Sequence, residues 1–166
     1  MAMSLNGIIA TEDNKEDFLS HDNWNEFVKI AQKTGCLIWG RKTYEIVKTW
    51  DESYLKPLKN IVKVILSGNS DLNLDEGFIK SSSPKDALEI LEGKGFKECI
   101  LTGGSTNNSS FAKLGLIDEV VVDVEGVVIG KGIPLFKQDD FELKLQLIES
   151  IQVSKNIVQL RYKVMK

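Results

Sequence analysis

The chain alternates short stretches of helical spacing with short apolar runs. Within residues 23–34 the apolar side chains recur at i, i+3, i+4 and i+7, which predicts an amphipathic helix that Gly35 can end in a left-handed conformation. Residues 36–39 follow as a buried strand. The same alternation predicts helices at 41–50 and 84–92, and a third that follows the segment 103–106 and ends at 114. It predicts strands at 61–66, 78–80, 98–102 and 118–124.

This alternation predicts an α/β fold. Short strands separated by helices, several of them apolar throughout, favour parallel pairing in one sheet with helices on both faces. The C-terminal part differs, because residues 141–151 and 157–164 alternate apolar and polar side chains around a turn at 154–156. We expect an antiparallel hairpin there, which makes the sheet mixed. No repeat or linker divides the chain, so residues 1–166 are expected to form a single domain.

The composition restricts the partners. With 42% hydrophobic residues and a formal net charge of −3, the chain is globular and slightly acidic. A nucleic-acid-binding surface needs an excess of Lys and Arg, so no nucleic acid is expected, and any anion site must be local. No apolar run approaches the length of a membrane span. Cys36 and Cys99 lie in apolar runs, which is typical of buried thiols in a reducing compartment such as the cytoplasm.

Two junctions between a predicted strand and a predicted helix suit an anion. In the first, Gly40 precedes Arg41, Lys42 and Thr43, so a close backbone approach, two cations and a hydroxyl meet at a helix start. In the second, the segment Gly103–Thr106 leaves bare backbone amides accessible. Taken singly, either junction could be a solvated helix start or a tight turn. Together, on one sheet edge, they indicate a dinucleotide, although neither is a triphosphate-binding loop or the glycine fingerprint of the doubly wound fold.

The residues also resemble a known family. The segments that carry the resemblance follow one another over nearly the whole chain, and they are 4–10, 40–45, 66–67, 103–104, 115–119 and 130–136. They look like the dihydrofolate reductase superfamily. The later segments most closely resemble the reductase domain of riboflavin biosynthesis, which is the C-terminal part of a deaminase-reductase, and its free-standing relatives.

The resemblance implies a three-layer fold and a reductase activity. The fold would be a mixed, mostly parallel sheet of about eight strands with helices on both faces and the C-terminal antiparallel hairpin. The activity would be hydride transfer from NADPH to a pterin-like or aminopyrimidine (ribosylamino) substrate. Among these proteins the alternatives are a true dihydrofolate reductase that makes tetrahydrofolate and a catalytically weak NADP(H)-binding module. The protein is expected to be a monomer or a homodimer.

The resemblance also assigns roles to residues. Arg41, Lys42 and Thr43, which follow Gly40, would hold the phosphates on the adenosine side, and Ser67 would approach the ribose 2′-phosphate. The pyrophosphate would meet Gly103, Gly104, Ser105 and Thr106, and the nicotinamide would be bordered by Ile9 and Ala10.

The substrate-orienting acid of dihydrofolate reductases lies early in the first helix, where this chain has Asn23, with Asp22 one residue away. Both are therefore candidate catalytic residues. Asn23 and Glu26 also have the spacing of a capping box, and we favour that interpretation. If Asn23 instead contacts substrate, its amide suits a neutral pyrimidine. Asp123 is a second candidate acid, although a strand Asp is more often solvated. His21 is the only histidine and the cysteines lack ligand spacing, so no metal site is expected.

Overall fold

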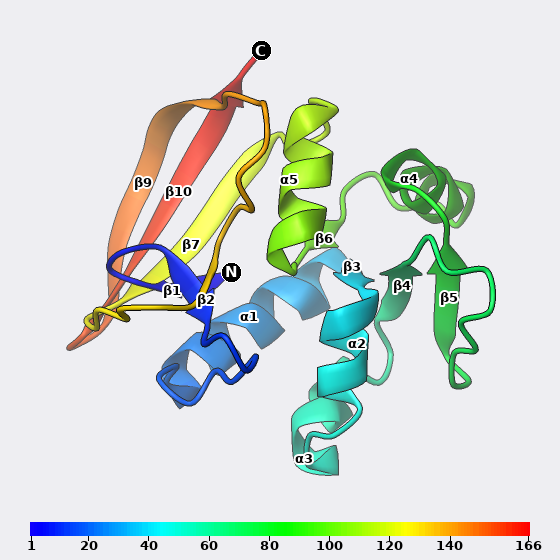
Figure 1. Cartoon of the computed structure of the whole chain (residues 1–166), viewed down its shortest axis with the longest axis horizontal. Coiled ribbons are helices and arrows are strands. Elements are labelled where there is room, and N and C mark those ends of the chain that lie inside the picture. The colour runs from blue at the N-terminus through cyan, green and yellow to red at the C-terminus, as the bar shows by residue number, and fades with distance from the viewer. The chain divides into compact units, whose positions relative to one another are not determined.

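The computed structural model describes residues 1–166 (Figure 1). The chain forms two compact units. The first unit contains Met1–Glu26 and Asn108–Lys166, and the second contains Phe27–Asn107. The expected single domain over residues 1–166 stays a prediction.

The second unit is built on a wholly parallel sheet. Its strands are β3 (Cys36–Gly40), β4 (Val62–Leu66), β5 (Phe78–Ser81) and β6 (Ile100–Leu101), in the order β5-β4-β3-β6. Every residue of β3 is buried, as an apolar strand between two neighbours requires. Gly40 pairs with Leu66 and Leu66 with Ser81, so β3, β4 and β5 end at the same level.

Helices cover this sheet. They are α2 (Arg41–Val47), α3 (Glu52–Leu55), the short 3-10 helix η1 (Lys56–Leu58) and α4 (Pro84–Gly93), while α1 (His21–Thr34) ends in this unit and α5 (Ser105–Lys113) begins in it. In the strand order, the connection from β3 to β4 runs toward β5, whereas the connection from β5 to β6 runs the opposite way. Because parallel crossovers are right-handed in nearly all proteins, α2 and α4 lie on opposite faces. The predicted α/β layering is therefore confirmed.

Local signals fix several of these helix ends. The Ser83 hydroxyl accepts a hydrogen bond of 3.1 Å from the Asp86 N–H at the start of α4, where Pro84 is the first helical residue. Gly35 follows α1 with a φ of +79°, and its N–H donates to the Ala31 carbonyl at 2.8 Å. Both features confirm what the sequence predicted.

The first unit holds the antiparallel part of the fold. Its four-stranded sheet has the order β1-β7-β10-β9, from β1 (Ala2–Ser4), β7 (Glu119–Glu125), β10 (Ile157–Met165) and β9 (Lys144–Ser154). Only β1 and β7 are parallel. β9 and β10 form the predicted C-terminal hairpin. The strands β2 (Ile8–Ala10) and β8 (Ile133–Pro134) form a separate antiparallel pair.

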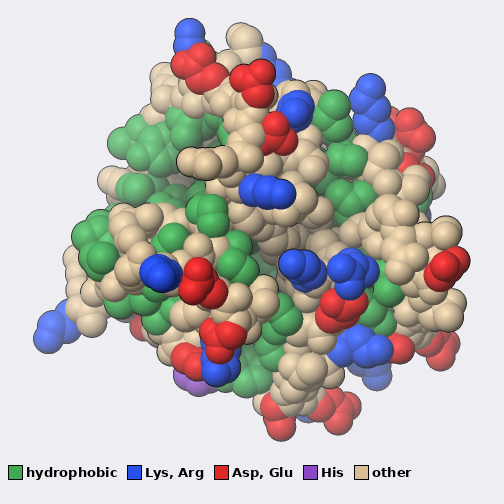
Figure 2. Space-filling view, in the orientation of Figure 1, with side chains coloured by type: hydrophobic (Ala, Val, Ile, Leu, Met, Phe, Trp, Pro, Cys, Tyr) green, Lys and Arg blue, Asp and Glu red, His purple; other side chains and the backbone are tan.

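Where a single mixed sheet of about eight strands is expected, the structure has ten strands in two four-stranded sheets and one two-stranded pair. The hairpin leaves large apolar side chains 42–53% exposed, and these are Leu145, Leu147, Ile148, Ile151, Val158 and Met165. Figure 2 shows apolar side chains reaching the surface over this part of the chain. Whether the protein is a monomer or a homodimer stays a prediction. No helix has both the length and the apolar character that crossing a membrane demands.

The β2–β8 pair depends on a close backbone approach. A Cβ on Gly132 would lie 2.4 Å from the Ala10 carbonyl oxygen and 2.5 Å from Ile8 Cγ2, whereas a Cβ on Gly130 would meet nothing within 4 Å. We therefore expect Gly132→Ala to lower the free energy of unfolding by about 1–3 kcal/mol, because overpacking must displace backbone. Gly130→Ala, the matched control, should change it by less than about 0.5 kcal/mol. Chemical denaturation of both variants measures the difference, and equal effects would contradict the packing argument.

Candidate functional site

The two predicted anion junctions are adjacent in the second unit. β3 and β6 pair directly, and the Gly40 N–H donates to the Gly103 carbonyl at 2.8 Å while the Thr102 N–H donates to the Ile38 carbonyl at 3.1 Å. The residues after each strand therefore lie side by side at the carboxyl edge of the sheet. This edge is where the strand order reverses around β3, which is the place where open α/β sheets bind ligands.

The glycines of this edge leave room that side chains would fill. Gly103 has a φ of +90°, a conformation that favours glycine, and the Gly103–Gly104 peptide bond is cis. A Cβ on Gly104 would lie 3.8 Å from Thr43 Oγ1, and a Cβ on Gly40 would lie 2.9 Å from Asn107 Nδ2. Thr43 and Asn107 therefore stand directly beside the two glycine junctions.

Hydroxyl groups at this edge lack partners. Thr102 Oγ1 and Ser105 Oγ are buried and make no hydrogen bond, and Ser105 is only 7% exposed. Ser105 also begins α5, whose first N–H groups have no partner within the helix. A buried unpaired polar group costs about 1–3 kcal/mol, so such groups in a folded protein call for an explanation. An oxyanion bound at Gly103–Ser105 would accept from these donors.

The cations of the edge are available to a ligand. Arg41 Nη1 lies 2.6 Å from Glu45 Oε1 in an exposed pair one helical turn apart, and exposed pairs of this kind are weak. Lys42 is exposed, and the structure records no ion pair for it. Thr106 is exposed in the first turn of α5.

Ser67 follows β4 at the same edge and is buried. Its N–H donates to the Ser81 carbonyl at 2.9 Å, and its Oγ accepts from the Asn69 N–H at 3.1 Å. The Ser67 hydroxyl proton thus remains free to donate. Lys80 Nζ donates to the Leu72 carbonyl at 3.3 Å, which holds the loop that follows Ser67.

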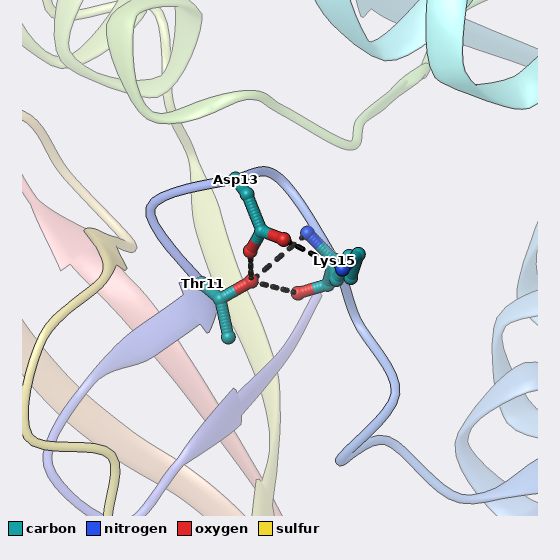
Figure 3. A network of polar contacts seen from close by, with 3 residues as sticks. All are labelled: Thr11, Asp13 and Lys15. Atoms are coloured by element: carbon teal, nitrogen blue, oxygen red, sulfur yellow. Dashed lines mark hydrogen bonds and ion pairs between the residues drawn. The ribbon is translucent and has the colours of Figure 1, made fainter.

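The other predicted site residues lie in the first unit. Ile9 and Ala10 are buried in β2. Thr11, Asp13 and Lys15 tie down the loop that follows (Figure 3): the Lys15 N–H donates to Thr11 Oγ1 at 3.0 Å, and Lys15 Nζ lies 2.8 Å from Asp13 Oδ2. The hydrogen bond from Lys15 lowers the pKa of Asp13. The end of β2 is therefore fixed by a compact polar turn.

The structure corrects the capping interpretation of Asn23. The helix begins two residues earlier than expected, at His21, so Asn23 lies inside its first turn. The Asn23 side chain does not accept from helix N–H groups, because its Oδ1 is buried without a partner and its Nδ2 donates to Glu125 Oε1. Asp22 is exposed on the same turn.

Glu125 was missed by the sequence analysis. It lies on β7, is buried, and accepts through Oε1 from both the Asn23 amide and the Ser20 N–H, the latter at 2.8 Å. The one available signal is that acidic residues occur at the alternate positions 119, 123 and 125 of an otherwise apolar strand. The buried carboxylate of Glu125 therefore contacts the start of a helix that lies about a hundred residues earlier in the sequence, since Asn23 and Glu125 are 102 residues apart.

Asp123 is buried. The expectation that an Asp on a strand is exposed to solvent is therefore wrong for this residue. Gln159 Nε2 donates to Asp123 Oδ1 at 2.8 Å. Burial raises the pKa of Asp123, and the nearby carboxylates of Glu26 and Glu125 act in the same direction. The Gln159 hydrogen bond and the amino terminus oppose this shift.

With this geometry established, comparison with known proteins decides the family. Residues 1–159 match the RibD C-terminal domain. This chain belongs to the RibD C-terminal domain family. The resemblance noted from the sequence is therefore confirmed.

Known proteins match nearly the whole of this RibD C-terminal domain chain. YwjB of Bacillus subtilis (strain 168), itself uncharacterised, is 32% identical over 98% of this chain and 94% of its own. A crystal structure from Shewanella sp. PV-4, of a protein assigned to riboflavin biosynthesis, is 26% identical with a TM-score of 0.79 and covers 100% of this chain and 97% of its own. RibD of Acinetobacter baumannii (19% identity, TM-score 0.80) shows the same fold over 99% of this chain but only 56% of its own.

Cys36 is buried, as its apolar run predicts, whereas Cys99 is only half-buried. Cys36 donates to the Glu98 carbonyl at 3.2 Å, and burial raises the pKa of its thiol to about 12. At neutral pH this thiol stays protonated and is no nucleophile.

The raised pKa of Asp123 has a consequence for stability. A carboxyl group that binds its proton more tightly in the folded state contributes stability below its unfolded pKa and loses it as pH rises through the folded pKa. We expect Asp123→Asn, which keeps the acceptor for Gln159, to become more stabilising relative to wild type as pH rises from about 4 to about 7. Denaturation at several pH values measures this trend.

Asp86 is the control with the opposite sign. Hydrogen bonds from Ser82 lower its pKa, so its contribution is present above the unfolded pKa and lost as pH falls. Asp86→Asn should therefore destabilise the protein more at pH 7 than in acid. A flat pH dependence of the Asp123→Asn difference would contradict the burial account.

Proposed function

We propose that this protein is an NADPH-dependent reductase that transfers a hydride to an aminopyrimidine (ribosylamino) substrate. The observation that carries the proposal is the pair of buried, unpaired hydroxyls of Thr102 and Ser105 beside the Gly103–Gly104 junction. These hydroxyls lie at the second junction, and Arg41 and Lys42 lie at the same edge of the sheet. The chain as a whole is slightly acidic, so these two cations provide local positive charge. Membership of the RibD C-terminal domain family supports the reductase activity.

The phosphates of the cofactor would be held at the carboxyl edge. Gly103, Gly104 and Ser105 provide bare amides and a hydroxyl for the pyrophosphate, with Thr106 beside them. Arg41, Lys42 and Thr43 suit the phosphates on the adenosine side, and the free proton of Ser67 suits the ribose 2′-phosphate. A 2′-phosphate needs cations and hydroxyls at one place, which is why we expect NADPH to bind more tightly than NADH.

Bound NADPH supplies the hydride, so the protein's own residues bind, orient and exclude water. Ile9 and Ala10, which are buried in β2, would border the nicotinamide. Asn23 would orient the substrate through the oxygen that has no partner in the protein. Asp22 is exposed and is the weaker candidate for this role.

Asn23 and the name of one relative support the proposed substrate class. A relative of this fold from Thermotoga maritima is named a diaminohydroxyphosphoribosylaminopyrimidine deaminase/5-amino-6-(5-phosphoribosylamino)uracil reductase, and this chain covers 55% of it at 17% identity. An uncharged amide suits such a neutral pyrimidine better than a substrate that needs a carboxylate. Oxidation of NADPH with this uracil compound, followed by absorbance, tests the proposal. Oxidation with dihydrofolate alone would favour a folate reductase, and oxidation with neither would favour a binding module.

Removal of the Arg41 guanidinium should weaken NADPH binding. A charge-assisted hydrogen bond contributes about 1.5–3 kcal/mol, so Arg41→Ala should raise the Kd for NADPH by about 10–100-fold. Arg161→Ala is a matched control, because Arg161 is similarly exposed and also pairs with a carboxylate, that of Glu119 at 2.6 Å. Titration by fluorescence measures both, and an unchanged Kd for Arg41→Ala would contradict the phosphate role.

Removal of the Ser105 hydroxyl should weaken NADPH binding without lowering the stability of the protein. Because Ser105 Oγ has no partner in the protein, Ser105→Ala should leave the free energy of unfolding unchanged or raise it, yet raise the Kd for NADPH by about 3–10-fold. Ser109 is the control on the same helix, since its hydroxyl donates to the Lys137 carbonyl at 2.7 Å. Ser109→Ala should instead lower stability by about 1 kcal/mol. If Ser105→Ala binds NADPH as wild type does, its hydroxyl has no cofactor role.

A further inference from the structure

Asn23 is buried in an unusual way for an amide side chain. It is only 4% exposed, and its two polar atoms have different surroundings. Nδ2 donates to Glu125, whereas Oδ1 is buried and has no hydrogen-bond partner. A buried acceptor without a donor costs about 1–3 kcal/mol, so a residue with this arrangement calls for an explanation beyond packing.

Glu125 decides which end of the amide faces which way. Asn23 Nδ2 donates to Glu125 Oε1, so Oδ1, on the other side of the amide, faces away from this carboxyl group. Glu125 is itself buried, and the Ser20 N–H donates to the same carboxylate oxygen at 2.8 Å. The orientation of the Asn23 amide is therefore fixed by a carboxylate that is held in place from the backbone.

Support of the helix start does not account for this arrangement. The hydrogen bond from the Ser20 N–H already joins the residue before α1 to Glu125 without any contribution from Asn23. Asn is a poor helix former, and an apolar residue at a position 4% exposed would avoid burying an unpaired oxygen. The hydroxyl of Ser20 is a second buried atom without a partner next to the same carboxylate. Two unpaired polar atoms around one carboxylate point to a ligand.

We propose that Glu125 is a positioning residue that presents Asn23 Oδ1 as a hydrogen-bond acceptor for an N–H group of the substrate ring. This inference rests on the proposed function and deepens it. The substrate must then present a ring N–H to Asn23 rather than a carbonyl oxygen. A heterocycle whose ring nitrogens carry no hydrogen is excluded, because its approach would leave Oδ1 buried and unpaired.

Two substitutions of Glu125 test whether it positions Asn23 or only supports the structure. Glu125→Gln keeps an oxygen that can accept from both Asn23 and Ser20. Glu125→Leu keeps a similar volume but has no acceptor. A third variant, Asn23→Leu, keeps the bond between Ser20 and Glu125 and removes only the proposed acceptor. It serves as the test of the same hypothesis if Glu125→Leu does not fold.

The probes are 5-amino-6-(5-phosphoribosylamino)uracil and its two analogues methylated on one ring nitrogen each. Their affinities are measured by calorimetry without NADPH, because the proposed reaction would consume the parent compound in its presence. We expect wild type to bind the parent compound about 5–100-fold more tightly than one of the methylated analogues. Glu125→Leu and Asn23→Leu should lose this discrimination, and Glu125→Gln should retain most of it.

The outcomes distinguish this inference from the proposed function. Equal affinity of wild type for all three compounds would overturn the N–H assignment. Discrimination that persists in a folded Glu125→Leu, or in Asn23→Leu, would overturn the positioning role. Failure of wild type to bind NADPH would contradict the reductase proposal instead, and the comparison of the three compounds without NADPH would still decide the role of Glu125.

Discussion

The candidate cofactor site depends on the parallel pairing of β3 with β6. This pairing places the Gly40 N–H at hydrogen-bond distance from the Gly103 carbonyl, so that two segments separated by more than sixty residues meet at one edge. Everything proposed for the phosphates follows from that contact. The cations after Gly40 and the bare amides after Gly103 would be two unrelated loops without it. Glycine is required at Gly103, where φ is positive.

Unpaired polar atoms link the two parts of the account. Buried side-chain oxygens without partners occur at Thr102 and Ser105, at Ser20 and Asn23, and at Asn108. The first pair lies at the glycine junction of the second unit and the second pair lies around Glu125 in the first. Each place reduces the stability of the free protein, and a ligand that satisfies these atoms would restore it. Binding would therefore stabilise the protein, which is a property expected of a ligand site and not of a structural turn.

The sequence predicted those features that depend on nearby residues. Gly35 and Ser83 end and begin their helices as expected, and the two glycine junctions were found because turn chemistry is local. The short strands β2 and β8 were missed, since two or three residues carry no periodicity and pair with distant segments. The capping interpretation of Asn23 was wrong because its true partner, Glu125, lies 102 residues away. The burial of Asp123 likewise arises from tertiary packing that no local pattern contains.

The most direct test of the central claim is to map NADPH binding onto the backbone amides by nuclear magnetic resonance. The account predicts that the largest shifts on titration fall on the amides of Gly40–Thr43 and Gly103–Ser105, and that NADH produces the same pattern at higher concentration. Saturable binding of NADPH that leaves the amides of both junctions unshifted would contradict it.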